Sequence, residues 1–95
     1  MSVIEILRSH EGEIKKRFGV RRIGIFGSFA RGEQKEFSDV DVLVEFEKPT
    51  FDNFMNLAFF LEDLFLQKVD LVTPNSLSPY IGSYVNAEVI WADQG

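Results

Sequence analysis

The sequence predicts a small α+β domain in which short strands and helices alternate. Three apolar stretches of strand length, at 20–26, 40–46 and 69–73, are separated by turn-forming residues. Two longer stretches, at 3–18 and 52–67, carry apolar residues at helical spacing. The chain has 95 residues, of which 45% are apolar and 26% charged, so we expect one folded domain along its whole length. The order of these elements indicates a small sheet packed with helices.

Charge and composition exclude several function classes. Ten Lys and Arg residues against fifteen Asp and Glu leave a net charge of −5. This argues against direct nucleic-acid binding, because such binding depends on basic residues that neutralise backbone phosphates. A single nucleotide needs only local positive charge or a metal ion. The absence of cysteine rules out disulfides and thiolate metal sites. No apolar run approaches about 18 residues and no signal-peptide pattern opens the chain, so we expect a cytoplasmic protein without a membrane segment.

The first helix is expected to begin after Ser2 and to end at Gly19. Ser2 and Glu5 form the S-x-x-E pattern of a capping box, and apolar residues at helical spacing continue to Phe18. His10, the single histidine, lies on the apolar stripe, so we interpret it as a packing residue rather than a ligand or a catalyst. A basic cluster near the helix end is interpreted as solvated, or alternatively as facing an acidic partner or the nucleotide: Lys15, Lys16, Arg17, Arg21 and Arg22.

The middle of the chain is expected to form two strands joined by a turn and a loop. The strand at 20–26 runs into the turn Gly27-Ser28. One helical turn over 29–32 and a polar loop over 33–38 follow it. The strand at 40–46 has the clearest pattern in the chain.

The C-terminal half is expected to form two helices and two strands. Pro49 and Thr50 end the second strand, and Asp52 or Asn53 caps a long helix that continues to about Gln67. Three further elements follow: a strand at 69–73, a helix that opens with Ser78-Pro79 and ends at about Asn86, and a short edge strand at 89–91.

Two acidic residues at the start of the second strand indicate a metal site. Asp39 and Asp41 are two positions apart, and the strand period of two puts both carboxylates on one face. Adjacent like charges repel and raise one pKa unless a cation lies between them. Mg²⁺ suits such a pair, because it is usually held by one or two carboxylates together with substrate phosphates. The opposite face is expected to be core and carries Val40, Val42, Val44 and Phe46.

The turn that precedes this acidic pair can bind phosphate. Gly27 permits a phosphate to approach the backbone closely, Ser28 adds a hydroxyl, and the N–H groups that open a helical turn attract anions. Arg31, one turn further on, can pair with a phosphate oxygen. A third carboxylate, Asp70, opens the next strand and can act as a second-metal ligand or as a general base toward an attacking hydroxyl. Each residue alone has an ordinary structural explanation, but together they favour phosphoryl or nucleotidyl transfer.

These residues carry a family resemblance. Gly27-Ser28, ten intervening residues and Asp39-x-Asp41 match the signature GSx10DxD. Its two ends lie in the segments GSFARGE and SDVDVLVEF, and VDLVTP follows later in the chain. Over residues 20–75 the chain resembles the minimal nucleotidyltransferase (MNT) branch of the DNA polymerase β-like nucleotidyltransferase superfamily. The resemblance implies the nucleotidyltransferase fold, an α+β fold with a small mixed sheet and helices packed mainly on one face.

The resemblance also implies a function. Characterised MNT proteins are antitoxins that transfer AMP from ATP to a tyrosine of a HEPN-domain ribonuclease toxin. We therefore expect Mg²⁺-dependent transfer of AMP from ATP to a hydroxyl of a cognate HEPN toxin. The resemblance assigns catalysis and metal binding to Asp39, Asp41 and Asp70, and nucleotide binding to Gly27, Ser28 and Arg31.

Two other functions stay open at this point. The chain can be an antitoxin that neutralises its toxin by contact alone, with a slow or vestigial site. It can also transfer a nucleotide to a small molecule. The larger enzymes of the superfamily carry an additional domain for base and acceptor recognition. The 95 residues do not include such a domain, so the acceptor and the base preference are left open.

The stretch at 54–66, FMNLAFFLEDLFL, is apolar almost all round. The stripe that faces the sheet is expected to comprise Phe54, Leu57, Ala58, Leu61, Leu64 and Phe65. Met55, Phe59, Phe60 and Leu66 then have no obvious place in so small a core. Either the core is wide enough to include some of them, or they form an exposed patch for a partner. We predict that Phe59 or Phe60 lies in a protein–protein contact, with another protein or in a homodimer.

Overall fold

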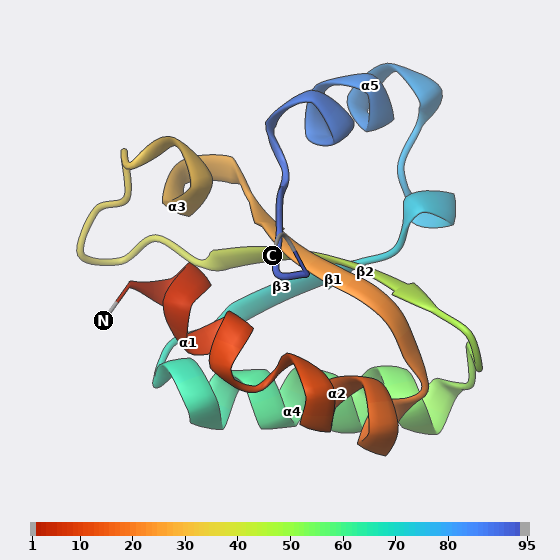
Figure 1. Ribbon diagram of the computed structural model, residues 1–95. Coiled ribbons are helices and arrows are strands. Elements are labelled where there is room, and N and C mark those ends of the chain that lie inside the picture. The colour runs from red at the N-terminus through yellow and green to blue at the C-terminus, as the bar shows by residue number, and fades with distance from the viewer. Residues whose placement is uncertain (1, 94–95) are drawn as a thin grey trace.

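The computed structural model describes residues 2–93 and shows an α+β fold, as expected (Figure 1). Its elements, in chain order, are α1 (Val3–Ser9), α2 (Glu11–Phe18), β1 (Val20–Phe26), α3 (Gly27–Arg31), β2 (Val40–Phe46), α4 (Phe51–Phe65), β3 (Val69–Val72), the 3₁₀ turn η1 (Pro74–Ser76), α5 (Pro79–Glu88) and β4 (Ile90–Trp91).

The four strands form one mixed sheet in the order β3-β2-β1-β4. β1 pairs antiparallel with both β2 and β4, whereas β2 and β3 are parallel. A parallel pair needs a crossover connection, and α4 supplies it between β2 and β3. The mixed sheet that the resemblance implied is confirmed.

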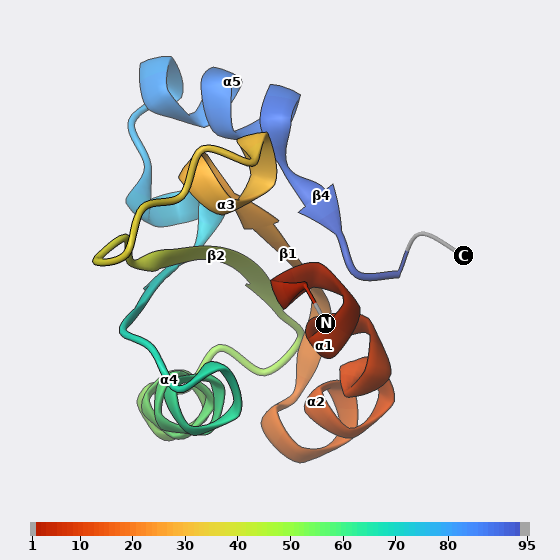
Figure 2. The same cartoon turned by 90° about the vertical axis from the view of Figure 1, so that its left-hand side faces the viewer.

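One face of the sheet is covered by α1, α2 and α4, and the core lies between them and the strands (Figure 2). The other face is bordered by α3 and α5, which stand over one end of the sheet (Figure 1). The expectation of helices mainly on one face is therefore confirmed. The fully buried residues of this core cluster are Leu7, Ile14, Ile23, Ile25, Val40, Val42, Val44, Leu57 and Leu61. Leu43 is also fully buried but lies outside the cluster.

The N-terminal segment forms two helices, and the prediction of one helix over 3–18 is wrong. The capping box of Ser2 and Glu5 is present, as expected. The helix breaks at His10, whose φ of −113° and ψ of 7° leave the helical region. The Oγ of Ser9 donates to the carbonyl of Ile6 at 2.7 Å, and Nδ1 of His10 lies 3.0 Å from the same carbonyl. Side chains that bond to this carbonyl offer it an alternative to the continuing helix.

The long helix α4 begins earlier than the sequence indicated. Thr50 is the N-cap, and its Oγ1 accepts from the backbone N–H of Asn53 at 3.1 Å, so the assignment of the cap to Asp52 or Asn53 is wrong. The helix ends at Phe65, two residues before the expected end, because Leu66 takes the left-handed conformation with φ of 55°. Within residues 2–93, no helix has both the length and the apolar character to cross a bilayer.

The remaining boundaries differ by one or two residues. α3 begins at Gly27 rather than at 29, β3 ends one residue earlier than 73, and α5 continues to Glu88 instead of ending at about 86. The N-cap of α5 is Ser78, whose Oγ accepts from Ile81 N–H at 3.2 Å, as expected. The longer α5 matters for the site, because it brings a further carboxylate to it.

Candidate active site

The sheet register brings the acidic residues together on the face that α1, α2 and α4 leave open. Asp41 in β2 and Asp70 in β3 are direct partners in the parallel ladder, and neighbouring strands lie about 4.8 Å apart. Asp39 precedes β2 by one residue and has the same parity as Asp41, so it belongs to the same face. Val40, Val42 and Val44 are fully buried on the other face, as the alternation predicted.

Asp41 lies at the centre of this group and is partly buried. Burial raises the pKa of its carboxyl group, and the negative charges of Asp70, Asp39 and Glu88 raise that pKa further, whereas Arg31 lowers it. Removal of a carboxylate from water and repulsion from neighbouring anions both disfavour its ionised form. A cation bound beside Asp41 would relieve this repulsion.

The carboxylates fit a metal ion that is shared with a substrate, rather than a closed protein cage. Within residues 2–93, no three His, Cys, Asp or Glu side chains converge into a ready-made metal site. Asp39 and Asp70 are exposed, and only Asp41 is partly buried. Mg²⁺ prefers oxygen ligands and commonly takes one or two carboxylates, with phosphate oxygens and water completing its shell. The donor set on this face has that chemistry.

Gly27 forms the turn between β1 and α3 directly beside Asp41. The register pairs Phe26 with Asp41, so the next residue lies next to the carboxylate. Gly27 is buried and has a φ of 72°, a conformation that L-residues rarely adopt. A Cβ at this position would lie 3.0 Å from Cγ of Asp41. The glycine is therefore needed both for the turn and for the approach of the backbone to the acid.

Ser28 and Arg31 lie on α3, the short helix that begins at this turn. Ser28 is partly buried in the first turn of α3, next to Gly27. Arg31 is half exposed and is held by two carboxylates: Nε donates to Glu33 Oε1 at 2.6 Å, and Nη1 donates to Glu88 Oε2 at 2.9 Å. The hydrogen bonds to Glu33 and then to Glu88 raise the pKa of Arg31.

Glu88 is the site residue that the sequence did not reveal. Its Oε1 accepts from the backbone N–H of Gly27 at 2.9 Å, while Oε2 binds Arg31. The pairing of β1 with β4 places it there. Gly24 pairs with Trp91 and Ile25 with Ile90, so the end of α5 lies beside the start of α3, where Glu88 reaches Gly27. The signal in the sequence is an acidic residue just before a short edge strand.

A cavity of about 400 Å³ adjoins the site at Asp39. It is lined by Glu36, Phe37, Ser38, Asp39, Gln67 and Lys68. The loop before β2 and the segment after α4 therefore leave space beside the exposed acid. A larger substrate can extend from the acids into this space.

His10 and three of the five basic residues singled out in the sequence have structural partners. His10 lies against the ring of Phe60, with centroids 6.3 Å apart, so its packing role is confirmed. Three members of the basic cluster form ion pairs, Lys15 with Glu11, Arg17 with Glu13 and Arg22 with Glu45. The guanidinium of Arg22 also stacks over Trp91, with its Cζ atom 3.7 Å from the ring centroid. The cluster lies mainly at the surface, in line with the solvated interpretation, and its ion pairs are an addition that the sequence did not predict.

Comparison with known proteins identifies relatives of this architecture. A family model described as a nucleotidyltransferase domain matches residues 7–91. The chain is 49% identical over 87 residues to the protein adenylyltransferase MntA of Thermococcus cleftensis. That alignment covers 90% of this chain and 88% of the relative.

Solved structures share the fold. One of a minimal nucleotidyltransferase superposes with a TM-score of 0.76 at 37% identity and covers 95% of both chains. A toxin–antitoxin structure with AMP-PNP gives a TM-score of 0.72 at 23% identity, covering 90% of this chain and 71% of that one. A complex of the tri-AMPylated Shewanella oneidensis HEPN toxin with MNT antitoxin gives a TM-score of 0.66 at 18% identity. That match covers 94% of this chain and 71% of the other. At these lower identities the last two establish a likeness of fold.

Proposed function

We propose a specific reaction from the premise that the chain belongs to the nucleotidyltransferase-domain family and is a nucleotidyltransferase. It transfers AMP from ATP to a tyrosine hydroxyl of a HEPN-domain toxin and so acts as the antitoxin. The observation that carries this proposal is the placement of Asp39, Asp41 and Asp70 on one open face, with the Gly27 turn packed against Asp41. The relative named as a protein adenylyltransferase supports a protein acceptor.

In this reaction, Asp39 and Asp41 would hold Mg²⁺, and the turn at Gly27 and Ser28 would hold the β- and γ-phosphates. Mg²⁺, when bound, neutralises the charge that develops on the phosphate oxygens. Arg31 has N–H donors for the pyrophosphate in addition to those that bind Glu33 and Glu88. The chain contributes mainly position and electrostatic stabilisation, which are the principal sources of rate enhancement in phosphoryl chemistry.

The bond changes are those of an in-line displacement. The acceptor oxygen forms a bond to the α-phosphorus, and the bond from that phosphorus to the oxygen bridging the α- and β-phosphates breaks. Pyrophosphate leaves on the side of the Gly27-Ser28 turn. Asp70 lies on the neighbouring strand from Asp41 and accepts the hydroxyl proton, or alternatively holds a second metal ion.

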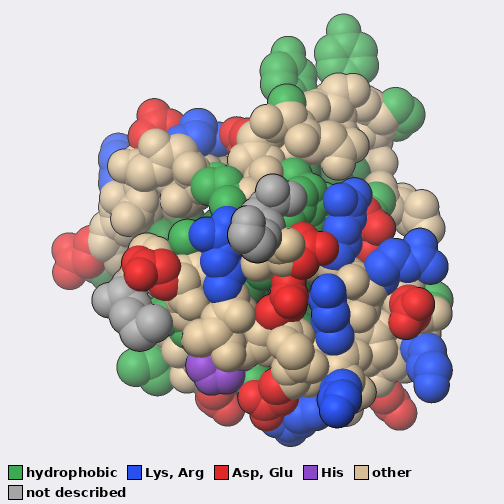
Figure 3. All heavy atoms as spheres, viewed as in Figure 1, with side chains coloured by type: hydrophobic (Ala, Val, Ile, Leu, Met, Phe, Trp, Pro, Cys, Tyr) green, Lys and Arg blue, Asp and Glu red, His purple; other side chains and the backbone are tan. Residues whose placement is uncertain are grey.

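Exposed apolar side chains beside the site favour a protein as the acceptor. Tyr80, Ile81 and Tyr84 on α5 are each more than half exposed. Apolar side chains stand out from the surface over α5, above the open face of the sheet (Figure 3). α5 also reaches the site through Glu88. Exposed apolar patches on small proteins mark interaction surfaces, and a small-molecule acceptor would need none.

Label transfer tests the proposal. A HEPN-domain toxin that binds this chain is incubated with the purified chain, MgCl₂ and either α-³²P-ATP or γ-³²P-ATP. We expect the toxin to acquire label from α-³²P-ATP alone, and mass spectrometry to place AMP on a tyrosine. Label from γ-³²P-ATP would indicate phosphate transfer and would overturn the proposal.

The same assay separates catalysis from neutralisation by contact. The alternative of a non-catalytic antitoxin draws on the absence of a ready-made three-ligand metal site in residues 2–93. In that case Asp41→Asn would still silence the toxin, and no label would transfer. If the chain is the adenylyltransferase that we propose, Asp41→Asn loses both the label and the protection of cells from the toxin.

A further inference from the structure

Glu88 joins two parts of the phosphate-binding element from a distant part of the chain. One carboxylate oxygen accepts from Gly27 N–H and the other accepts from Arg31, each at 2.9 Å. Gly27 begins α3 and Arg31 ends it, so the carboxylate spans the whole helix. A carboxylate that binds both a backbone N–H and a guanidinium forms two charge-assisted hydrogen bonds, which are stronger than neutral ones.

The position of Glu88 is unfavourable unless these two bonds compensate for it. Glu88 is the last residue of α5, and no basic residue lies in the last turn of that helix. A negative charge at a helix C-terminus is disfavoured by the helix dipole. Glu88 also adds a negative charge beside Asp41. Neither the helix nor the acidic face gains stability from this carboxylate, so its contacts with α3 are what it contributes.

We propose that Glu88 is a positioning residue, which holds the Gly27 turn and the Arg31 guanidinium in place for the nucleotide phosphates. The inference deepens the proposed function and rests on it. Arg31 uses two of its five N–H donors on Glu33 and Glu88, which leaves three for a phosphate. The N–H and hydroxyl of Ser28 are separate from the N–H that Glu88 binds. The carboxylate therefore orients this element without consuming its donors.

The pairing of β4 with β1 positions Glu88 beside α3. β4 pairs with β1 through Ile90 and Trp91, immediately after Glu88. Gly24 of β1 permits this pairing, since a Cβ there would lie 2.7 Å from the carbonyl oxygen of Ile90. The last strand thus acts as an anchor that fixes the end of α5 against the start of α3. This explains why a two-residue strand at the sheet edge affects the site.

Triphosphate affinity tests the proposal. Titration calorimetry with α,β-methylene ATP and MgCl₂ compares the wild type, Glu88→Gln and Glu88→Ala. The amide of Glu88→Gln still accepts from Gly27 N–H but cannot pair as an anion with Arg31, so we expect about tenfold weaker binding. Glu88→Ala loses both contacts and should bind more weakly still. Glu13→Gln, which removes an exposed carboxylate of an ion pair on α2, is the control and should bind like the wild type.

A double-mutant cycle distinguishes positioning from a general structural effect. If Glu88 acts through Arg31, Glu88→Gln should change the affinity little in an Arg31→Gln background, because coupled residues are not additive. Additive losses would overturn the positioning role. Tighter binding by Glu88→Gln than by the wild type would also overturn it, because the carboxylate would then be a competitor for the phosphate position.

A measurement without nucleotide keeps the two proposals separate. In the free protein, ¹⁵N relaxation should show the amides of Gly27 and Ser28 more mobile in Glu88→Ala, and the Arg31 Nη1 signal should shift, because Nη1 is the atom that donates to Glu88. Unchanged relaxation and an unchanged Nη1 signal would overturn the positioning role, whatever the nucleotide does. If the wild type fails to bind the analogue while these signals respond, the proposed function fails, and the contact between Glu88 and α3 is still established.

Discussion

Gly27 packs against Asp41 so closely that no side chain fits between them. A Cβ on Gly27 would lie 3.0 Å from Cγ and 3.3 Å from Cβ of Asp41, and the φ of 72° already disfavours any other residue. The turn that is proposed to hold phosphates and the acid that is proposed to hold the metal are thus fixed relative to each other. A substitution that displaces one of them is therefore expected to impair both phosphate binding and metal binding.

Gly27→Ala should therefore reduce activity more than stability. The left-handed conformation costs an alanine about 1–2 kcal/mol, and the new methyl group displaces the Asp41 carboxylate. We expect a stability loss of that size, measured by urea unfolding, and a loss of transfer of at least about a hundredfold, equivalent to about 2.7 kcal/mol. Gly12→Ala is the matched control, because a Cβ there meets nothing within 4 Å. Alanine in α2 should raise the free energy of unfolding by up to about 1 kcal/mol and leave transfer unchanged. Near-normal transfer by Gly27→Ala would contradict the assignment of this turn.

Asp39→Asn and Asp41→Asn should keep the fold and abolish transfer. An amide has nearly the shape of the carboxylate but lacks the charge that attracts Mg²⁺. Calorimetric titration with Mg²⁺ and ATP measures the loss of metal-dependent binding. Binding that is unchanged in both variants would remove these residues from the metal site.

Asp41→Asn should also make the metal-free protein more stable near neutral pH. Because burial and the neighbouring acids raise the pKa of Asp41 in the folded state, the folded protein holds a proton that the unfolded chain releases between the two pKa values. The wild type therefore loses stability as pH rises through that window, and the amide variant does not. Thermal melts in EDTA between pH 4 and 8 check this, and parallel curves for the two proteins would contradict it.

Asp70→Asn should separate binding from transfer. Asp70 lies on β3, one strand away from Asp39 and Asp41, and is exposed where an acceptor hydroxyl can reach it. If it accepts the hydroxyl proton, the affinity for Mg²⁺ and ATP should change less than about threefold, while transfer falls by about 10²–10⁴, the usual range for a general base. Equal losses of binding and transfer would make Asp70 a primary metal ligand instead.

The acidic face and the Gly-Ser turn were predictable because they depend on local rules. Strand alternation decides which face Asp39 and Asp41 share, and the short turn after β1 places Gly27 next to them. The parallel partner of Asp41 could be anticipated from the chain order, in which a helix connects the two strands. Such features depend on the two-residue alternation of a strand or on a short separation along the chain, and both can be read directly from the sequence.

The break at His10 and the role of Glu88 were not predictable in this way. At His10 the spacing of apolar residues continues without interruption, and the break depends on side-chain bonds to one carbonyl of Ile6. Glu88 reaches Gly27 over 61 positions, and only the register of β4 brings them together. The same tertiary pairing places Glu88 against Arg31, which the sequence indicated only as a partner for a phosphate oxygen. Tertiary pairing decides these features, and no local pattern encodes it.

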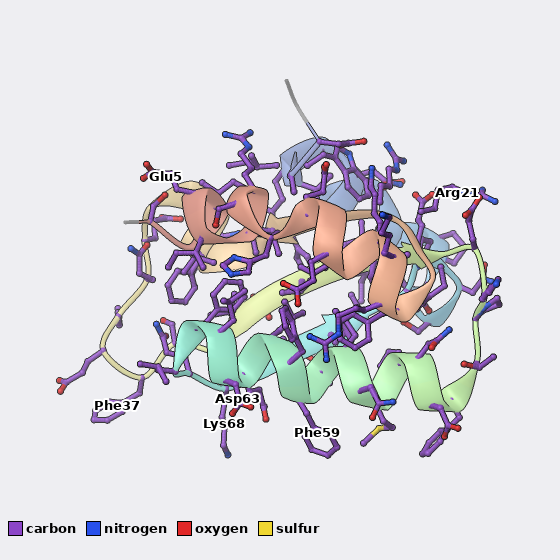
Figure 4. The ribbon with its side chains drawn as sticks, turned by 60° about the horizontal axis from the view of Figure 1, so that its bottom comes forward. Glu5, Arg21, Phe37, Phe59, Asp63 and Lys68 are labelled. Atoms are coloured by element: carbon purple, nitrogen blue, oxygen red, sulfur yellow. The ribbon has the colours of Figure 1, made fainter. Side chains whose placement is uncertain are left out.

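The structure separates the two phenylalanines of α4 for which a protein contact was predicted. Phe60 packs against Phe18, with ring centroids 5.3 Å apart, and belongs to the margin of the core. Phe59 is 58% exposed and points away from the sheet (Figure 4). Phe51 and Leu66, at the two ends of the same helix, are also exposed. Of the two residues, only Phe59 is therefore available for the predicted contact, together with the other exposed apolar residues at the ends of α4.

We predict that a second copy of this chain packs on that surface, with two α4 helices antiparallel around Phe59. In such a pair Asp52, near the start of one helix, would lie at the same end as Lys68, which follows the other helix. Phe59→Asp should then shift a dimer toward monomer by at least about tenfold in Kd, equivalent to about 1.4 kcal/mol. It should leave a cooperative melt. Sedimentation equilibrium and circular dichroism measure the two effects.

Two further variants complete this test. Asn56→Asp adds the same charge at an exposed position of α4 without removing an apolar side chain, and it should leave the association unchanged. Phe60→Asp places a carboxylate against Phe18 and His10, and it should unfold the protein or lower its stability by about 3 kcal/mol. A chain that is monomeric at all concentrations, or a dimer that Phe59→Asp does not weaken, would show that α4 does not pair with a second copy. A melt of Phe60→Asp like that of the wild type would place its ring outside the core.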